Sequence, residues 1–376
     1  MSDRKQIIFC ADGIFPHAVG GMQRHSALLI RELAVSNAFD LIVIHSHDKK
    51  VFTDVPNVTE FPLSFNLFKL TYLTYLKNCY NYSKEVFNII QQYPTAVIYS
   101  QGFSVWYGIK QIGNRVIINP HGLEPFQAIT TRDKIITYQY RLLQRYLFKH
   151  AAKVVSLGGR LTDILKQEIA DAKNKIVVLP NATNVGAYQQ RNFDGAKLQL
   201  LYVGRFAFNK GINILMQAVK QLNNEGYINR LQFNIVGKGP LYDEYVREYS
   251  FPNANFIGFA SDERLQQLYQ ENDLFVFPTL FEGMPTVVLE AMAYGMPIVV
   301  TDTGATSELV NGENGYLIEK NNVRALKSAI QQFFQLHAEQ RQQLSKKSYD
   351  KVVANFTWQV VAKKHAELFT TFNPER

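Results

Sequence analysis

The chain has 376 residues, which exceeds the usual size of one hydrophobic core, so two domains are expected. Hydrophobic residues make up 47% of it and charged residues 19%, a balance that supports a packed globular protein. The formal net charge of +8 indicates an anionic partner, such as a phosphorylated donor, an acidic lipid headgroup or nucleic acid.

The start of the chain passes from polar residues directly into a predicted strand over 6–10. It lacks the long apolar core and cleavage site of a signal peptide. The sequence contains no run of eighteen apolar residues, so no transmembrane helix is expected. Cys10 and Cys79 have neither metal nor redox spacing, which favours free thiols in a reducing compartment. We therefore expect a cytoplasmic protein.

The first predicted strand leads into a loop that closes with Gly20 and Gly21, before a helix over 22–33. A glycine pair before a helix lets the backbone approach a phosphate, and an ordinary glycine turn is the alternative. The GxGxxG spacing is absent, which argues against a nicotinamide oxidoreductase.

Further strands are predicted over 39–44, 96–100 and 116–119. The first of these ends near His45 and His47, a pair without further ligands that we interpret as structural or solvent-facing. The last runs into His121, which is placed to reach a ligand at the carboxyl edge of a sheet; a structural histidine is the alternative.

Two features of this half raise the question of membrane contact. Residues 63–91 are aromatic-rich, with apolar residues at helical spacing, which favours packing against a sheet over contact with a membrane or an apolar acceptor. Arg141, Arg145 and Lys149 recur at every fourth position of a predicted helix, as a solvated face or as a surface for anionic lipid. The aromatic segment contains Lys69, Lys77 and Lys84.

Strands over 153–156 and 175–179 complete the first half, and the polar stretch 181–197 is interpreted as a linker. The second half begins with a strand over 198–203, which Gly204, Arg205 and later Lys210 follow. Two cations at a strand end can neutralise a diphosphate, including its charge as a leaving group.

The next predicted strands also end in turns that contain glycine. The strand over 232–236 runs into Gly237, and the strand over 255–257 is followed by Gly258 and Phe259. A helix is then predicted over 262–271, with Ser261 as its N-cap.

The most informative stretch is 274–302, which reads LFVFPTLFEGMPTVVLEAMAYGMPIVVTD. Its two apolar runs fit strands buried on both faces of a parallel sheet, with a loop and a helix over 287–294 between them. Ligands of such a βαβ unit lie at the carboxyl end of the strands, against the N-terminus of the helix. Glu282 and Glu290 bracket that helix start and can accept hydrogen bonds from sugar hydroxyls; ordinary surface acids are the alternative.

These motifs, in this order, resemble the retaining GT-B glycosyltransferases of family 4 along nearly the whole chain. They are GG near the start, HG in mid-chain, GRF followed by Lys-Gly, GKGPL, and FEGMPTVVLEAMAYGMPIVVTDTG, the most specific block. Two departures are mild: Ala305 stands where many relatives have a second glycine, and Pro285-Thr286 where Gly-Leu is common. They do not change the predicted enzyme class, but they weaken the inference about which donor sugar the site accepts.

The resemblance implies an α/β protein of the GT-B fold, with two Rossmann-like domains facing each other across a deep cleft. The acceptor-binding domain would span 1–180, with a C-terminal helix over about 358–376 packed back onto it, and the nucleotide-sugar domain would span 198–357. The implied activity is that of a retaining hexosyltransferase that needs no metal. Metal independence agrees with the sequence, because no DxD-type motif is evident.

The resemblance also implies roles for individual residues. Glu282 would lie beside the donor sugar, Glu290 would hold the ribose, and His121 would contact the donor sugar near the reacting centre. The expected catalytic residues are His121, Arg205, Lys210 and Glu282. The expected donor-binding residues are Gly20, Gly21, Gly204, Gly237, Phe259, Gly283, Met284, Pro285, Thr286 and Glu290.

We expect no cofactor beyond a UDP- or GDP-linked sugar as substrate, and no nucleic-acid partner. The expected acceptor is a glycan or lipid-linked glycan in the assembly of bacterial surface polysaccharide, either lipopolysaccharide O-antigen or capsule. Peripheral contact with the anionic inner face of the cytoplasmic membrane would follow from a lipid-linked acceptor. A soluble small-molecule acceptor and a non-catalytic GT-B scaffold are the alternatives.

Overall fold

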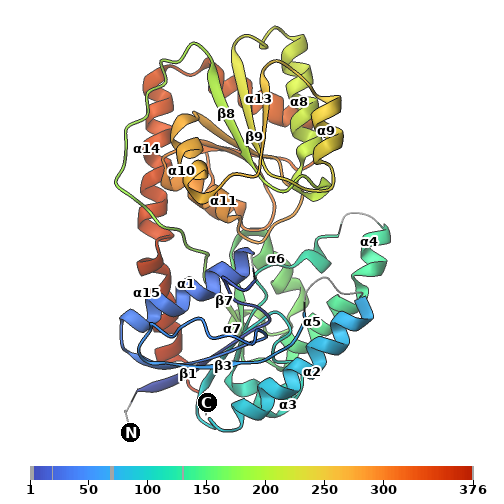
Figure 1. Ribbon diagram of the computed structural model, residues 1–376, viewed down its shortest axis with the longest axis vertical. Coiled ribbons are helices and arrows are strands. Elements are labelled where there is room, and N and C mark those ends of the chain that lie inside the picture. The colour runs from blue at the N-terminus through green and yellow to red at the C-terminus, as the bar shows by residue number, and fades with distance from the viewer. Residues whose placement is uncertain (1–3, 19, 68–71, 129–130, 375–376) are drawn as a thin grey trace. The chain divides into compact units, whose positions relative to one another are not determined.

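The computed structural model describes residues 4–18, 20–67, 72–128 and 131–374, so Lys69 of the aromatic segment lies outside the described residues. The chain divides into two compact units, each with a parallel sheet and helices on both faces (Figure 1). The first unit contains Met1–Asn181 and Trp358–Arg376, and the second contains Ala182–Thr357. No helix in the described ranges is long and apolar enough to cross a bilayer.

The sheet of the first unit has the strand order β3-β2-β1-β4-β5-β6-β7. Its neighbouring strands pair in parallel, so the carboxyl ends of the strands meet at one edge. The strand order reverses between β1 and β4, where open α/β sheets bind ligands. The strands are β1 (Lys5–Ala11), β2 (Phe39–His45), β3 (Val58–Pro62), β4 (Val97–Gln101), β5 (Val116–Asn119), β6 (Lys153–Ser156) and β7 (Ile176–Val178).

The helices of the first unit include the last helix of the chain. The aromatic-rich segment forms α2, which buries Cys79, Tyr82, Val86 and Ile90, so the predicted packing within the protein is confirmed. The Tyr82 hydroxyl donates to the carbonyl of Ala11 at 2.6 Å. The helices are α1 (Gly21–Val35), α2 (Tyr72–Ile90), α3 (Ile109–Ile112), α4 (Thr131–Ile136), α5 (Tyr138–His150), α6 (Gly159–Glu168), α7 (Ala172–Lys175) and α15 (Trp358–Thr371).

The sheet of the second unit has the order β10-β9-β8-β11-β12-β13, which is the Rossmann order. Its strand order reverses between β8 and β11. The strands are β8 (Leu198–Val203), β9 (Leu231–Val236), β10 (Ala254–Gly258), β11 (Leu274–Phe277), β12 (Ile298–Thr301) and β13 (Gly315–Ile318). The helices are α8 (Ile212–Asn224), α9 (Tyr242–Glu248), α10 (Asp262–Glu271), α11 (Thr286–Ala293), α12 (Thr306–Leu309), α13 (Val323–Gln335) and α14 (Ala338–Asn355).

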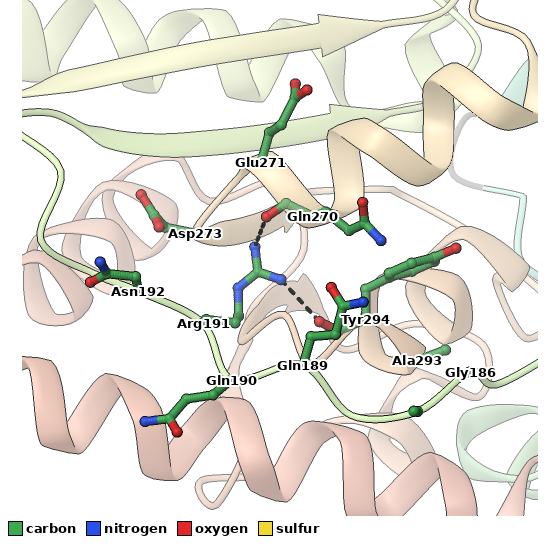
Figure 2. A pocket seen from close by; sticks show the side chains of 11 residues that line it. Gly186, Gln189, Gln190, Arg191, Asn192, Gln270, Glu271, Asp273, Ala293 and Tyr294 are labelled. Carbon is green, nitrogen blue, oxygen red and sulfur yellow. Dashed lines mark hydrogen bonds between the residues drawn. The ribbon is translucent and has the colours of Figure 1, made fainter.

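The segment interpreted as a linker is bound to the second unit through Arg191 (Figure 2). Its guanidinium donates to the carbonyls of Tyr269, Gln270 and Tyr294 at 2.9–3.1 Å. Two of these carbonyls end α10 and the third follows α11, so one cation satisfies groups that helix ends leave unpaired. Burial lowers the pKa of Arg191 to about 10, which leaves it charged at neutral pH. A cavity of about 340 Å³ lies beside this anchor.

Candidate active site

The predicted residues of the second unit gather at the carboxyl edge of its sheet, because each follows the end of a parallel strand. Gly204 and Arg205 follow β8, Gly237 follows β9, and Phe259 follows β10. The loop that carries Glu282 follows β11. This edge includes the point between β8 and β11 where the strand order reverses.

Lys210 and Glu282 form an ion pair at that point, with 2.6 Å between Lys210 Nζ and Glu282 Oε1. The Thr279 hydroxyl donates to the same carboxylate oxygen at 2.9 Å. Glu282 is 9% exposed, so its charge is largely removed from water and is held by these donors. A cation and a carboxylate 72 residues apart therefore meet between the two central strands.

Hydrogen bonds and a close backbone approach hold the loop of Lys210 against the loop of Glu282. Leu280 N–H donates to the carbonyl of Asn209 at 2.9 Å, and the Thr279 hydroxyl, whose one proton is shared between this carbonyl and Glu282, lies 3.0 Å from the carbonyl oxygen. Gly211 has φ of 69°, and a Cβ there would lie 1.8 Å from the carbonyl oxygen of Pro278. Only glycine allows this approach, which sets Lys210 beside the loop of Glu282.

The turn after β12 holds the other side of the Glu282 loop. Ala305 N–H donates to the carbonyl of Gly283 at 2.8 Å. A Cβ on Gly304, at φ of 57°, would lie 2.3 Å from the carbonyl oxygen of Gly283 and 2.4 Å from that of Glu282. The loop then enters α11 through Pro285, with Thr286 as the first helical residue. Met284 is buried below this helix start.

Glu290 lies one turn further along α11 and is half-buried. The Tyr269 hydroxyl, from α10, donates to Glu290 Oε2 at 2.9 Å. Burial, together with the charge of Glu290, raises the pKa of Tyr269 well above its ordinary value, so this hydroxyl remains a donor. The Tyr269 ring stacks on Tyr294, with 5.6 Å between ring centroids.

Two predicted side chains at this edge are exposed. Arg205 has no hydrogen-bond or ion-pair partner among the residues that the structure describes. Phe259 is 82% exposed. A Cβ on Gly237, at φ of 135°, would lie 1.9 Å from the carbonyl oxygen of Gly204, so the ends of β8 and β9 can approach only with glycine there.

The other predicted residues belong to the first unit. Gly20 has an extended backbone and caps α1, and a Cβ on Gly21 would meet no atom within 4 Å. His121 follows β5 with φ of 55°, in the left-handed region that favours glycine. The His121 ring lies 5.4 Å from that of His25 on α1, so the glycine loop and the HG turn lie close together.

His121 is neutral at physiological pH. Burial, reinforced by the neighbouring His365, lowers the pKa of His121 to about 3. Its Nε2 is buried and has no hydrogen-bond partner in the part of the chain that the structure describes. The ring can therefore offer a neutral hydrogen-bonding nitrogen to a ligand, but not a positive charge.

Several residues of these sites were missed by sequence reasoning. In the second unit they are Thr279, which holds Glu282, and Tyr269, which holds Glu290. In the first unit, Asp12 follows β1, and its buried Oδ1 has no hydrogen-bond partner among the described residues. Its position one residue past an apolar strand is the signal that could have found it.

The predicted structural interpretation of His45 is confirmed. Its Nε2 lies 2.8 Å from Glu60 Oε1, and both side chains are buried. Within the described ranges, no three His, Cys, Asp or Glu side chains are grouped as a metal site would require.

Two family models match the chain, and together they cover most of both units. One, described as Glycosyltransferase Family 4, matches residues 19–186. The other, described as Glycosyl transferases group 1, matches residues 197–335.

Three curated relatives are each 26% identical to the chain. An uncharacterized glycosyltransferase of Methanocaldococcus jannaschii matches over 83% of this chain and 84% of its own length. The putative colanic acid biosynthesis glycosyltransferase WcaL of Escherichia coli K12 matches over 65% and 62%. The UDP-Gal:alpha-D-GlcNAc-diphosphoundecaprenol alpha-1,3-galactosyltransferase of Escherichia coli matches over 56% and 58%, so the last two matches span less than two thirds of those proteins.

Solved structures resemble the chain along nearly its whole length. Sucrose-phosphate synthase from Thermosynechococcus elongatus has a TM-score of 0.79 at 19% identity and covers 98% of each chain. Anabaena HepE in complex with UDP has a TM-score of 0.70 at 16% identity, covering 98% of this chain and 100% of its own. The apo lipopolysaccharide outer core galactosyltransferase WaaB has a TM-score of 0.67 at 18% identity, over 97% and 99%. At these identities the likeness establishes the fold.

Proposed function

The chain belongs to the group 1 glycosyltransferases of family 4 and has their GT-B fold, and we propose that it transfers a sugar with retention from a nucleotide-sugar donor to a hydroxyl of a glycan or lipid-linked acceptor. The observation that carries the proposal is the Lys210–Glu282 pair at the carboxyl edge of the Rossmann-ordered sheet, where Arg205 follows the end of β8. Two cations and a carboxylate there suit a donor that carries both a diphosphate and sugar hydroxyls.

In this reaction the bond between the anomeric carbon and the diphosphate breaks, and the acceptor oxygen forms the new bond on the same face. The acceptor proton passes to the departing diphosphate. Arg205 and Lys210 stabilise the negative charge that grows on the diphosphate, so no metal ion is needed for that purpose. The same-face path accounts for retention without a covalent glycosyl-enzyme.

The two carboxylates would have separate roles. Glu282, held by Thr279 and Lys210, would accept hydrogen bonds from the donor sugar. Glu290, held by Tyr269, would accept them from the ribose. Phe259 would offer an exposed ring to the nucleobase, and the start of α11 would offer backbone N–H groups to phosphate.

The proposed biological role is the assembly of bacterial surface polysaccharide. Relatives are described by their names as acting in colanic acid and capsular polysaccharide biosynthesis, and one as a galactosyltransferase with a diphosphoundecaprenol-linked acceptor. HepE was solved in complex with UDP, which supports a nucleotide-linked donor. A soluble small-molecule acceptor and a non-catalytic scaffold remain the alternatives.

A donor screen tests the activity. We expect the wild-type protein to hydrolyse one nucleotide-sugar of a panel of UDP-, GDP- and other linked sugars, with unchanged rate in EDTA. The initial anomer of the released sugar, read by NMR, should match that of the donor. No hydrolysis of any donor would favour the scaffold, and an inverted product would contradict retention.

A further inference from the structure

Three buried side chains form a continuous chain of hydrogen bonds from the last helix to the backbone of His121. His365 Nδ1 lies 2.8 Å from the carbonyl oxygen of Val361 in α15. His365 Nε2 lies 3.2 Å from the Tyr99 hydroxyl. Asn119 Nδ2 donates to that hydroxyl at 2.8 Å, and Asn119 Oδ1 accepts from His121 N–H at 2.9 Å. We call these contacts the His365–His121 chain.

Each hydrogen bond of this chain has only one direction. A carbonyl can only accept, so His365 Nδ1 must carry the proton and Nε2 must be the acceptor. The Tyr99 hydroxyl therefore donates to His365 and accepts from the amide of Asn119. That fixes the Asn119 amide with its oxygen toward His121. Burial lowers the pKa of His365 to about 4, so this tautomer persists at neutral pH.

The His365–His121 chain ends at a strained backbone position, that of His121. A non-glycine residue with positive φ is energetically disfavoured and persists where its surroundings determine it. At His121 the surroundings include the Asn119 amide on one side and the ring of His25, which itself lies 5.3 Å from the ring of Trp358. Tyr99, Asn119 and His365 are each no more than 1% exposed, so water does not replace a lost partner.

We infer that His365 and Tyr99 are positioning residues for the reaction, because they orient Asn119 and through it the backbone of His121. The inference rests on the proposed function and on the role that the family resemblance implies for His121, contact with the donor sugar. The C-terminal helix α15, which carries His365, would then contribute to catalysis, although none of the predicted site residues lies on it. Neither side chain needs to touch the substrate.

The decisive variant is Tyr99→Phe, which keeps the ring and breaks the chain between His365 and Asn119. We expect kcat/KM for transfer to fall about tenfold, the size of one lost buried hydrogen bond. Binding of the free nucleoside diphosphate should not change, because His121 would contact the sugar. Tyr82→Phe is the matched control, since Tyr82 is equally buried and also loses a hydrogen bond, to Ala11, away from His121.

A double-mutant cycle separates positioning from general stability. In the His121→Ala background, Tyr99→Phe should cause no further loss of kcat/KM, because the side chain to be positioned is gone. Equal losses from Tyr99→Phe and Tyr82→Phe, or a full tenfold loss in the His121→Ala background, would overturn the inference alone. Full activity of His121→Ala would overturn the proposed role of His121 together with it.

Discussion

At the scale of single residues, Arg205 and Lys210 have the same proposed role but differ in their surroundings. Lys210 holds a nearly buried carboxylate, whereas Arg205 is exposed. We predict that alanine at either position lowers kcat by about two to three orders of magnitude, as lost electrostatic donors do. Only Lys210→Ala should also lower the melting temperature, because it leaves Glu282 without its counter-charge.

The measurement is turnover together with thermal unfolding for both variants. Exposed Arg247 provides the control, and Arg247→Ala should change neither quantity. Near-wild-type turnover in both active-site variants would rule out the assigned role in leaving-group stabilisation.

Glu282 and Glu290 should differ in what they bind. We predict that Glu290→Ala chiefly weakens binding of the free nucleoside diphosphate, whereas Glu282→Ala reduces turnover more than that binding. Tyr269→Phe, which removes the donor to Glu290, should reproduce the Glu290 effect in weaker form. Calorimetry with the nucleoside diphosphate identified by the donor screen distinguishes them. Equal losses of affinity in both carboxylate variants would reject the division of roles.

Asp12 should make stability depend on pH. Burial raises the pKa of its carboxyl from 3.8 to about 7. Between these values the folded protein binds a proton that the unfolded chain has released, so the free energy of unfolding falls as pH rises, and the loss is complete above pH 7. We predict that Asp12→Asn is more stable than wild type at high pH, by roughly 4 kcal/mol, and equal to it at acidic pH.

Thermal or urea unfolding at several pH values measures this difference. The exposed Asp243 gives the control, because Asp243→Asn should leave the pH dependence unchanged. A constant difference between Asp12→Asn and wild type across the pH range would contradict the assignment.

At the scale of elements, the turn between β12 and α12 supports the Glu282 loop by close backbone contact. Gly304→Ala would place a Cβ 2.3 Å from the carbonyl oxygen of Gly283, at a backbone angle that alanine adopts poorly. We predict a loss of turnover of about tenfold or more, with a destabilisation of roughly 1–3 kcal/mol. The loop must move away, and Glu282 moves with it.

Gly312→Ala is the matched control for this element. A Cβ on Gly312 meets no atom within 4 Å, so its substitution should leave turnover and melting temperature close to wild type. If Gly304→Ala behaves like Gly312→Ala, the turn does not position the loop.

At the scale of the whole molecule, the net charge of +8 matters less than where the cations lie. In α5, Arg145 is paired with Glu168 at 2.5 Å and Arg141 donates to the carbonyl of Lys134, so two of the three predicted cations also have partners within the protein. Exposed apolar side chains lie on the same pair of helices, α4 and α5. They are Ile135, Ile136, Tyr138 and Leu142.

Cations and exposed apolar side chains on the same two helices fit the peripheral docking on an anionic membrane that we expect for a lipid-linked acceptor. We predict that changing Arg141, Arg145 and Lys149 to Gln weakens binding to anionic vesicles by about 2 kcal/mol at low salt, since each cation near the surface is worth about 1 kcal/mol and one is neutralised by Glu168. High salt should reduce the difference. Vesicle sedimentation measures it.

The control is a charge-matched variant of exposed cations elsewhere, Lys220, Arg247 and Lys320 to Gln. Equal loss in both triple variants would assign the binding to net charge alone. Equal binding to neutral and anionic vesicles would mean that α4 and α5 form only a solvated surface.

The sequence by itself determined the class of the protein and most of its framework. Runs such as 274–277 lack polar alternation because they are buried on both faces, and that signal is local. The order of the glycine, histidine and carboxylate motifs could be read for the same reason, and the family resemblance that it indicated is confirmed by the family models. The strands β3 and β13 were missed because both are short edge strands, and β3 carries Glu60 and Pro62.

Only the tertiary structure decided which side chains meet. Lys210 pairs with Glu282, Tyr269 holds Glu290, and His365 reaches Tyr99 from 266 residues away. Arg191 lies in a stretch that the sequence indicates is a linker, yet it donates hydrogen bonds to carbonyls at the ends of two helices. Such contacts depend on strand order and on glycines that permit close approach, and spacing along the chain does not encode them, because residues far apart in sequence become neighbours only when the sheet is assembled.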